Sequence, residues 1–182
     1  MFAVPTIETV RLRLRPWRDE DVDAWAAMNA DPRVTEFLGG PYPRVRSEVS
    51  ARRIRAQLEA NGYGWWVVEE RDGAPFAGII ALQEVPYDTP FTPANEIGWR
   101  FPFERWGRGY ATEGARAALE FAHAKLGWDE VVALTAATNV RSQRVMERLG
   151  MTRDPADDFD HPMLEPGDPL RPHVLYRVRR PR

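Results

Sequence analysis

Short apolar runs, alternating in places with charged residues, predict the strands of this chain. Over Val10–Trp17, the apolar Val10, Leu12 and Leu14 alternate with arginines, which is the period of a half-buried strand. Further apolar runs of strand length lie at Trp65–Glu70, Phe76–Val85, Glu96–Phe101, Val131–Ala136 and His173–Val178. An Asp-Gly pair separates the first two of these, and this pair between β-rich runs predicts a hairpin.

Longer segments with apolar residues at helical spacing predict helices between those strands. The expected helices are Asp19–Asn29, Ser47–Asn61, Thr112–Lys125 and Val140–Leu149. Val49, Ile54 and Leu58 form the expected apolar face of the second, and Gly150 is a typical left-handed cap for the last. The element order is then β-α-α-β-β-β-α-β-α-β-β. It predicts a mixed α/β fold in a single domain over residues 1–182.

The composition excludes several kinds of chemistry. The chain has 182 residues, 43% of them hydrophobic, which is enough for a buried core. It contains no cysteine, which excludes disulfides, thiolate metal sites and a cysteine nucleophile. No metal site is predicted. The chain has no apolar run near the length of a membrane span and no signal-peptide pattern, so we expect no membrane partner and a cytoplasmic location.

The charge balance argues against nucleic acid as a partner. The formal net charge is −2 and the sequence pI is about 6.0. Nucleic-acid binders use a summed basic field, which a mildly acidic chain lacks. The arginine clusters near residues 11–15 and 52–55 are therefore interpreted as solvated faces.

The segment Trp99–Glu120 carries the clearest functional pattern. A strand opens into a turn containing Gly107 and Gly109, and a helix follows from about Thr112. Glycines let a backbone bend tightly and approach a ligand closely. The start of a helix presents unpaired N–H groups and the positive end of its dipole. The combination predicts an anion site, most often one for a phosphate.

Two common phosphate-binding loops fit this segment poorly. The chain has no G-x-x-x-x-G-K-[ST] string, which a P-loop requires. A dinucleotide fingerprint requires a third Gly or an Ala where this chain has Thr112. That fingerprint also belongs in a first βαβ unit, whereas here a three-stranded meander precedes the turn.

A third loop matches better. The run Trp106-Gly107-Arg108-Gly109-Tyr110-Ala111 resembles the Q/R-x-x-G-x-G/A turn of the GNAT superfamily of N-acetyltransferases, with Trp106 in place of the usual Gln or Arg. Two further strings resemble signatures of the RimJ/RimL-like branch of that superfamily, which acetylates N-termini of ribosomal proteins. They are Asn139-x-x-Ser142-x-x-Val145 through Met151 and Thr9-x-Arg11-Leu12-x-Leu14-Arg15-Pro16. The resemblance covers about residues 6–153.

The resemblance implies a fold and a cofactor. The central sheet would be mostly antiparallel, with a V-shaped splay between its fourth and fifth strands, Glu96–Phe101 and Val131–Ala136. Acetyl-CoA would bind in the splay, and an amine acceptor would be the second substrate. Similar proteins are often homodimers. The residues implied in cofactor binding are Trp99, Phe101, Trp106, Gly107, Arg108, Gly109, Tyr110, Ala111, Thr112, Asn139 and Ser142.

The resemblance also implies catalytic roles. Without a cysteine to carry the acyl group, direct transfer in a ternary complex is the economical mechanism. Glu96 is the first residue of a Glu-Ile pair, the position at which several members of the family have their general base. Ser142 is the expected donor to the leaving thiolate, because Met146 occupies the position of the usual tyrosine. An amide on the cleft strand, at Trp99 or a neighbour, would stabilise the oxyanion.

Several alternatives stay open at this level. Asp160, His161 and His173 lie on a long excursion bordering the acceptor side and compete with Glu96 as the base. Asn139 either contacts the cofactor or caps its helix. The whole protein could instead be a non-catalytic acyl-CoA sensor or a dimerisation scaffold. The acceptor is undetermined among protein N-termini, aminoglycosides, polyamines and amino acids.

Overall fold

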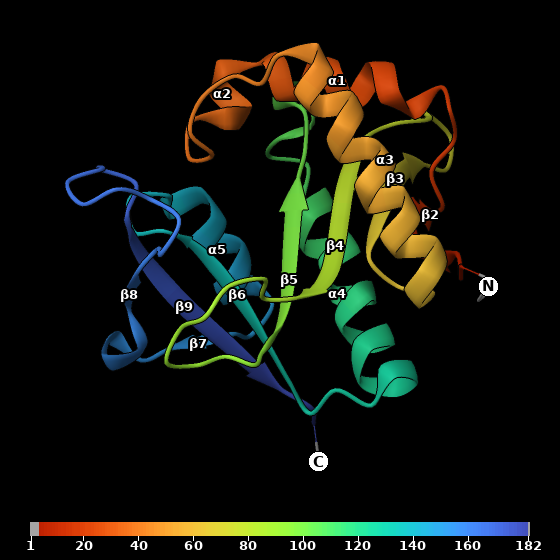
Figure 1. Ribbon diagram of the computed structural model, residues 1–182. Helices are drawn as coiled ribbons and strands as arrows, with labels where there is room; N and C mark the ends of the chain where they lie inside the picture. Colours follow the sequence, from red (N-terminus) through yellow and green to blue (C-terminus); the bar gives the residue numbers. More distant parts are fainter. Residues whose placement is uncertain (1–3, 182) are drawn as a thin grey trace.

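A twisted sheet crosses the whole molecule in the computed structural model, which describes residues 4–181 (Figure 1). Within that range its strand order is β1-β2-β3-β4-β5-β6-β9-β7, and β8 pairs with the outer part of β9. Each pairing is antiparallel except that of β5 with β6. The strands are β1 (Ile7–Glu8), β2 (Leu12–Arg15), β3 (Trp65–Glu70), β4 (Gly78–Glu84), β5 (Asn95–Arg100), β6 (Glu130–Ala136), β7 (Thr152–Arg153), β8 (Phe159–Asp160) and β9 (Pro172–Arg179).

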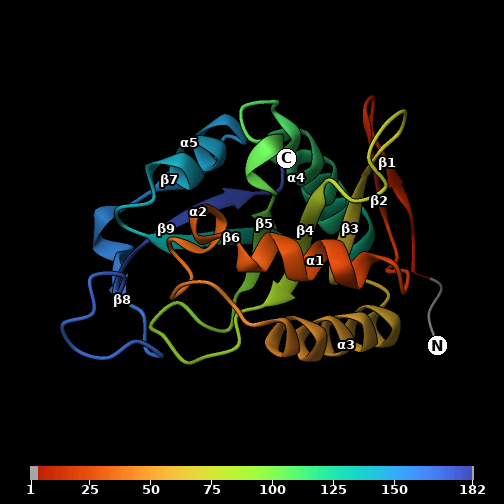
Figure 2. The same cartoon turned by 90° about the horizontal axis from the view of Figure 1, so that it is seen from above.

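Helices cover both faces of this sheet. Figure 2 shows α1 and α3 on one side and α4 and α5 on the other. The helices are α1 (Asp21–Ala30), α2 (Pro32–Thr35), α3 (Arg44–Asn61), α4 (Tyr110–Phe121) and α5 (Val140–Arg148). One π-helical turn, Ala122–Leu126, extends α4 and ends at Gly127.

Small side chains bring α4 close to the sheet. A Cβ at Gly114 would lie 3.1 Å from Cγ1 of Ile80 on β4, tighter than an ordinary van der Waals contact. Ala115, Ala118 and Ala122, on the same side of the helix, are fully buried. On the opposite face, Trp25 of α1 stacks edge to face with Trp17, in the loop before α1, and with Trp65 of β3, with ring centroids 5.7 Å and 6.5 Å apart. The two layers therefore hold the strands between them rigidly.

The expected splay lies between β5 and β6. Strands β4 and β5 pair continuously, from Ile79 opposite Arg100 to Glu84 opposite Asn95. Strands β5 and β6 pair at one position only, Glu96 opposite Val132, and then diverge (Figure 1). The mixed α/β fold and its mostly antiparallel sheet are thus confirmed. The divergence leaves one edge of β5 without a neighbouring strand.

Several local expectations were wrong. The strand expected over Val10–Trp17 is shorter, with β2 limited to Leu12–Arg15, and Val10 is 88% exposed in the turn that joins it to β1. The turn forms because Oγ1 of Thr9 accepts from the amide of Leu12. Val49 is 54% exposed, since the buried face of α3 runs instead through Ser47, Ala51, Ile54 and Leu58. The short elements α2, β7 and β8 were not predicted.

Candidate active site

A cleft of about 1480 Å³ occupies the splay between β5 and β6. It runs from the glycine turn at the start of α4, past α5, to the side chains of Glu96, His161 and His173. Every residue that the sequence assigned to the cofactor or to catalysis lines this cleft. They are Glu96, Trp99, Phe101, Trp106, Gly107, Arg108, Gly109, Tyr110, Ala111, Thr112, Asn139 and Ser142.

The glycine turn presents unpaired amides to the cleft. Gly107 and Gly109 have φ of +74° and +79°, in the left-handed region that favours glycine. A Cβ at Gly107 would meet open space, so the backbone there is accessible. Helix α4 begins at Tyr110 without a side-chain cap, which leaves the amides of its first turn without intrahelical partners. These residues fit the pyrophosphate of a nucleotide cofactor.

The N-terminal hairpin holds this turn in place, through a contact that sequence reasoning missed. Glu113, in the first turn of α4, accepts from Oγ1 of Thr9 at 2.6 Å and from the amide of Arg11 at 2.9 Å. Arg11 also donates to the carbonyl of Arg108 at 3.0 Å. Partial burial of Glu113 opposes its ionisation, but these hydrogen bonds outweigh it and lower its pKa. The sequence pointed to Thr9 and Arg11 as part of a family signature, but it did not indicate that Glu113 is their partner.

The free edge of β5 offers main-chain groups to a ligand. The amide of Val85 donates to the carbonyl of Ala94 at 2.9 Å, just beyond the register pair Glu84–Asn95. Main-chain groups of successive residues in a strand point in opposite directions, so those of Ala94, Glu96, Gly98 and Arg100 face β4. The amide of Trp99 therefore points away from β4 and toward the cleft, beyond the last residue that pairs with β6. An extended ligand arm can hydrogen-bond along this edge as a strand would.

Glu96 lies where β5 and β6 still meet, with its side chain in the cleft. Nε2 of Gln83, its cross-strand neighbour, donates to Oε2 of Glu96 at 3.0 Å. Burial in the cleft raises the pKa of Glu96 to about 7, although the hydrogen bond from Gln83 acts in the opposite direction. A carboxylate with this pKa is a suitable general base near neutral pH.

Aromatic and imidazole rings stand near Glu96. The ring centroids of His161 and His173 are 4.8 Å apart, and His161 lies 4.6 Å from Tyr87. Burial lowers the pKa of both histidines, which favours their neutral form. Burial, and then the charge of Glu96, raises the pKa of Tyr87. Asp160 does not line the cleft, and instead it pairs with Arg171 at 3.2 Å with 62% of its side chain exposed.

Helix α5 brings the second signature to the cleft. Oδ1 of Asn139 accepts from the amide of Ser142 at 3.2 Å, and its Nδ2 donates to Oγ1 of Thr135 at 2.9 Å. Asn139 is thus a helix cap that also lines the cleft. Ser142 and the buried Met146 are four residues apart and so lie on one helix face, beside the cleft.

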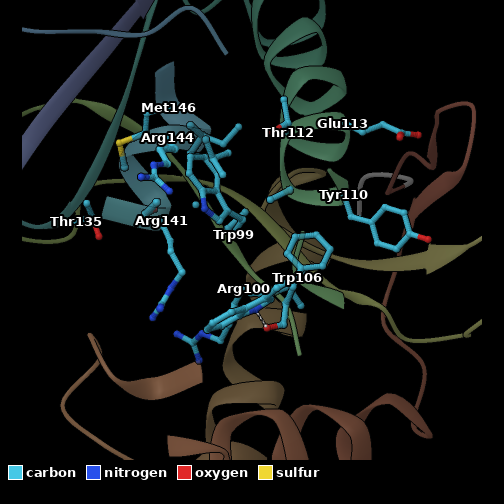
Figure 3. Close-up of a pocket in the computed structure, with 18 of the residues that line it drawn as sticks. Trp99, Arg100, Trp106, Tyr110, Thr112, Glu113, Thr135, Arg141, Arg144 and Met146 are labelled. Carbon is cyan, nitrogen blue, oxygen red and sulfur yellow. Dashed lines mark hydrogen bonds between the residues drawn. The ribbon is translucent and has the colours of Figure 1, made fainter. Parts of the chain in front are cut away.

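Arg100 and Arg141 also line the cleft, although the sequence analysis did not single them out. In Figure 3, Arg141 extends from α5 toward Trp106, and Arg100 lies below Trp99 near the α1 side. The guanidinium carbon of Arg141 is 4.7 Å from the Trp106 ring centroid, and Arg141 also pairs with Glu36 of the α2 segment. The sequence held one indication of Arg100: it lies four residues after Glu96 in the same expected strand, and the alternation of side chains in a strand puts both on one face.

Two further observations concern the described residues. Across residues 4–181, no three His, Asp or Glu side chains gather as they would around a metal ion. In the same range, no helix combines the length and apolar character that a membrane crossing needs.

Comparisons with known proteins place these features in a family. The family model described as "Acetyltransferase (GNAT) domain" matches residues 11–152. An Aspergillus fumigatus protein, FsC-acetyl coenzyme A-N(2)-transacetylase, is 32% identical over 157 residues, which cover 82% of this chain and 66% of that protein. The solved structure of an acetyltransferase from Agrobacterium tumefaciens has 29% identity and a TM-score of 0.77, over 99% of this chain and 97% of that one.

A third similarity concerns the fold alone. The structure of RimL, a ribosomal L7/L12 alpha-N-protein acetyltransferase in complex with coenzyme A, has a TM-score of 0.75 at 15% identity. It covers 96% of this chain and 98% of that chain.

Proposed function

The chain belongs to the GNAT acetyltransferase family, and on this premise we propose that it transfers the acetyl group of acetyl-CoA directly to a primary amine. One observation carries the proposal. The glycine turn and the uncapped start of α4 lie at one end of the cleft, and a carboxyl group whose pKa is close to neutrality lies at the other. A sensor of acyl-CoA would need the first of these features but not the second.

In the proposed reaction, acetyl-CoA lies along the free edge of β5 with its pyrophosphate on the amides from Gly107 to Ala111. Glu96 accepts a proton from the acceptor ammonium, directly or through a water molecule. The amine nitrogen then forms a bond to the thioester carbonyl carbon, and the amide of Trp99 donates to the resulting oxyanion. The carbon–sulfur bond breaks as the hydroxyl of Ser142 donates a hydrogen bond to the departing thiolate. The nitrogen, positively charged after the attack, loses its second proton, which passes to that thiolate directly or through a water molecule, so the products are the amide and free coenzyme A thiol.

The pKa of Glu96 bears on the kind of amine. An α-amino group has a pKa of about 7.7–8.0 and a lysine side chain about 10.4. A base with a pKa near 7 matches the first better than the second, because proton transfer is then nearly balanced. We therefore favour an α-amine, in keeping with a RimJ/RimL-like role. RimL, whose fold this chain shares, is a ribosomal L7/L12 alpha-N-protein acetyltransferase.

The test is release of free thiol from acetyl-CoA with a panel of α-amines, ω-amines and N-terminal peptides. Thermal stabilisation by acetyl-CoA is measured in parallel. Stabilisation together with amine-dependent thiol release is the expected result. Stabilisation without release under any acceptor would favour the sensor, and the absence of both would favour a scaffold.

A further inference from the structure

Arg100 shares one face of β5 with Glu96. Side chains of alternate strand residues point to the same side, so Glu96, Gly98 and Arg100 all face α1 and α3. Four residues of strand separate the Cα atoms of Glu96 and Arg100 by about 13 Å. A Cβ at Gly98 would have no atom within 4 Å, so the floor between the two charged side chains is open. Both side chains line the same cleft.

Its neighbours fix the position of Arg100 without neutralising its charge. Nη1 donates to Oδ1 of Asn29 at 2.6 Å, and Asn29 is itself fully buried against Ser47. The guanidinium carbon lies 5.0 Å from the ring centroid of Trp25 and 5.9 Å from that of Tyr42. A guanidinium has five N–H donors. Within residues 4–181, only the one donated to Asn29 has a partner, and no carboxylate pairs with Arg100.

Arg15 shows how this fold treats a buried arginine with a structural role. It donates to both carboxylate oxygens of Asp21 at 2.8 Å and to Oε2 of Glu69 at 2.7 Å. It also donates to the carbonyls of Pro16 and Pro75. Every side of that guanidinium is occupied by protein oxygen atoms. Arg15 thus has carboxylate partners within the chain and Arg100 has none among residues 4–181, which indicates that Arg100 can bind an anion from outside the chain.

The energetics support this interpretation. Burial lowers the pKa of Arg100 to about 10, which still leaves it protonated at neutral pH. The nearby Arg46 adds a second positive charge rather than a compensating negative one. Arg100 is half-buried at the floor of the cleft, so an incoming anion can reach the N–H donors that Asn29 leaves open and pair with a charge that burial has partly stripped of water.

Resting on the proposed function, we infer that the acceptor is an amine that also carries a carboxylate, with Arg100 binding the carboxylate and Glu96 receiving the proton of the amine. The planar guanidinium fork matches a carboxylate. The separation of about 13 Å between the two Cα atoms favours an acceptor longer than an α-amino acid, in which the two groups are separated by one carbon. It fits a short peptide best, because the amine of a peptide is the α-amine favoured above. An amino acid whose amine and carboxylate are several bonds apart meets the spacing alone, and it serves as a second probe of the carboxylate.

The experiment compares acceptors that differ only in this charge. The pairs are glycylglycine with its C-terminal amide and 6-aminohexanoate with 6-aminohexanamide. We expect the wild type to use each acid about 10- to 100-fold better than its amide in kcat/KM, the usual effect of a charge-assisted hydrogen bond. Arg100→Met should abolish that preference through KM, while the rate with the amides changes little. Arg100→Lys should restore part of it.

The controls separate this inference from the function on which it rests. Arg53 is exposed on α3 outside the cleft, and Arg53→Met should keep the full preference. Thermal stabilisation of Arg100→Met by acetyl-CoA shows that the variant is folded. Equal use of acid and amide by the wild type, or equal losses with both in Arg100→Met, would overturn the inference.

Binding without turnover provides a second readout. In the presence of coenzyme A, the product analogue 6-acetamidohexanoate should stabilise the wild type more than 6-acetamidohexanamide does. Arg100→Met should lose this difference. The measurement addresses Arg100 even if no amine releases thiol, which would contradict the acetyl transfer alone. Equal stabilisation by the two analogues would overturn the carboxylate site.

Discussion

The side-chain amide of Gln83 donates a hydrogen bond of 3.0 Å to the Glu96 carboxylate across β4 and β5. The orientation of that amide is fixed from its other end, because Nε1 of Trp65 donates to Oε1 of Gln83 at 2.7 Å. An indole nitrogen is only a donor, so the Gln83 oxygen must face Trp65 and its nitrogen must face Glu96. Trp65 and Gln83 thus hold the proposed base in one position.

Replacing the proposed base tests its role directly. Glu96→Gln keeps the size of the side chain but cannot accept the proton, and we expect kcat to fall by about 10²- to 10⁴-fold. The wild-type rate should rise with pH around a midpoint near 7, and the variant should lose this dependence. Thiol release between pH 5.5 and 9 measures both. Glu84→Gln, at the exposed end of β4, is the matched control, and an unchanged rate in Glu96→Gln would assign the base elsewhere.

The raised pKa of Glu96 also has a consequence for stability. The folded protein binds this proton more tightly than the unfolded chain, whose carboxyl has a pKa near 4.5. The contribution of protonated Glu96 to stability is therefore complete below about pH 4.5 and is lost as the pH rises through 7. The free energy of unfolding of the wild type should fall over that interval by on the order of 3 kcal/mol relative to Glu96→Gln. Denaturation by urea at pH 5 and pH 8 tests this, and parallel curves for the two proteins would contradict it.

Gln83 should tune the base rather than act as one. Its hydrogen bond lowers the pKa of Glu96 against the larger effect of burial. In Gln83→Leu, the midpoint of the pH–rate profile should move to higher pH, while the rate on the alkaline plateau changes little. A uniform loss of rate at every pH would instead indicate that Gln83 only maintains the structure.

A substitution in the glycine turn should weaken acetyl-CoA binding, whereas the same substitution at a glycine outside the cleft should not. Gly109→Ala forces a side chain into φ of +79°, at a cost of about 1–2 kcal/mol, and disturbs the amides proposed to bind the pyrophosphate. We expect a higher KM for acetyl-CoA as well as a lower melting temperature. Gly127, at φ of +70°, lies outside the cleft, so Gly127→Ala should lower stability only. An unchanged KM in Gly109→Ala would place the pyrophosphate elsewhere.

Ser142 and Asn139 lie in the same turn at the start of α5, and we expect their variants to differ: one should affect catalysis and the other stability. The cap contact uses the amide of Ser142, not its hydroxyl, so Ser142→Ala should preserve stability and lower kcat by roughly tenfold. Asn139→Ala removes the cap and should cost about 0.5–2 kcal/mol of unfolding free energy. Steady-state kinetics and urea denaturation of both variants give the comparison. Full activity in Ser142→Ala would show that Ser142 is not the group that donates to the departing thiolate.

Much of this site could be predicted from the sequence because its parts are local strings. The glycine turn, the Glu-Ile pair at residue 96 and the Asn139–Ser142 cap each lie within a few residues. Backbone preferences and side-chain periodicity act over this range, so the local pattern indicates the local structure. The strand Trp65–Glu70 was predicted with its observed limits for the same reason.

What the sequence could not supply are the partners of each part. Glu113 meets Arg11 from 102 positions away, and Arg100 meets Asn29 from 71 positions away. Which distant groups meet depends on strand order and on how closely α1 and α4 pack on the sheet, neither of which any short window of residues contains. The sequence by itself determined the elements, the glycine turn and the candidate residues. Only the tertiary structure decided that Glu96 has a pKa near 7 and that Arg100 has no acidic partner among residues 4–181, because burial and missing neighbours are properties of the packed chain.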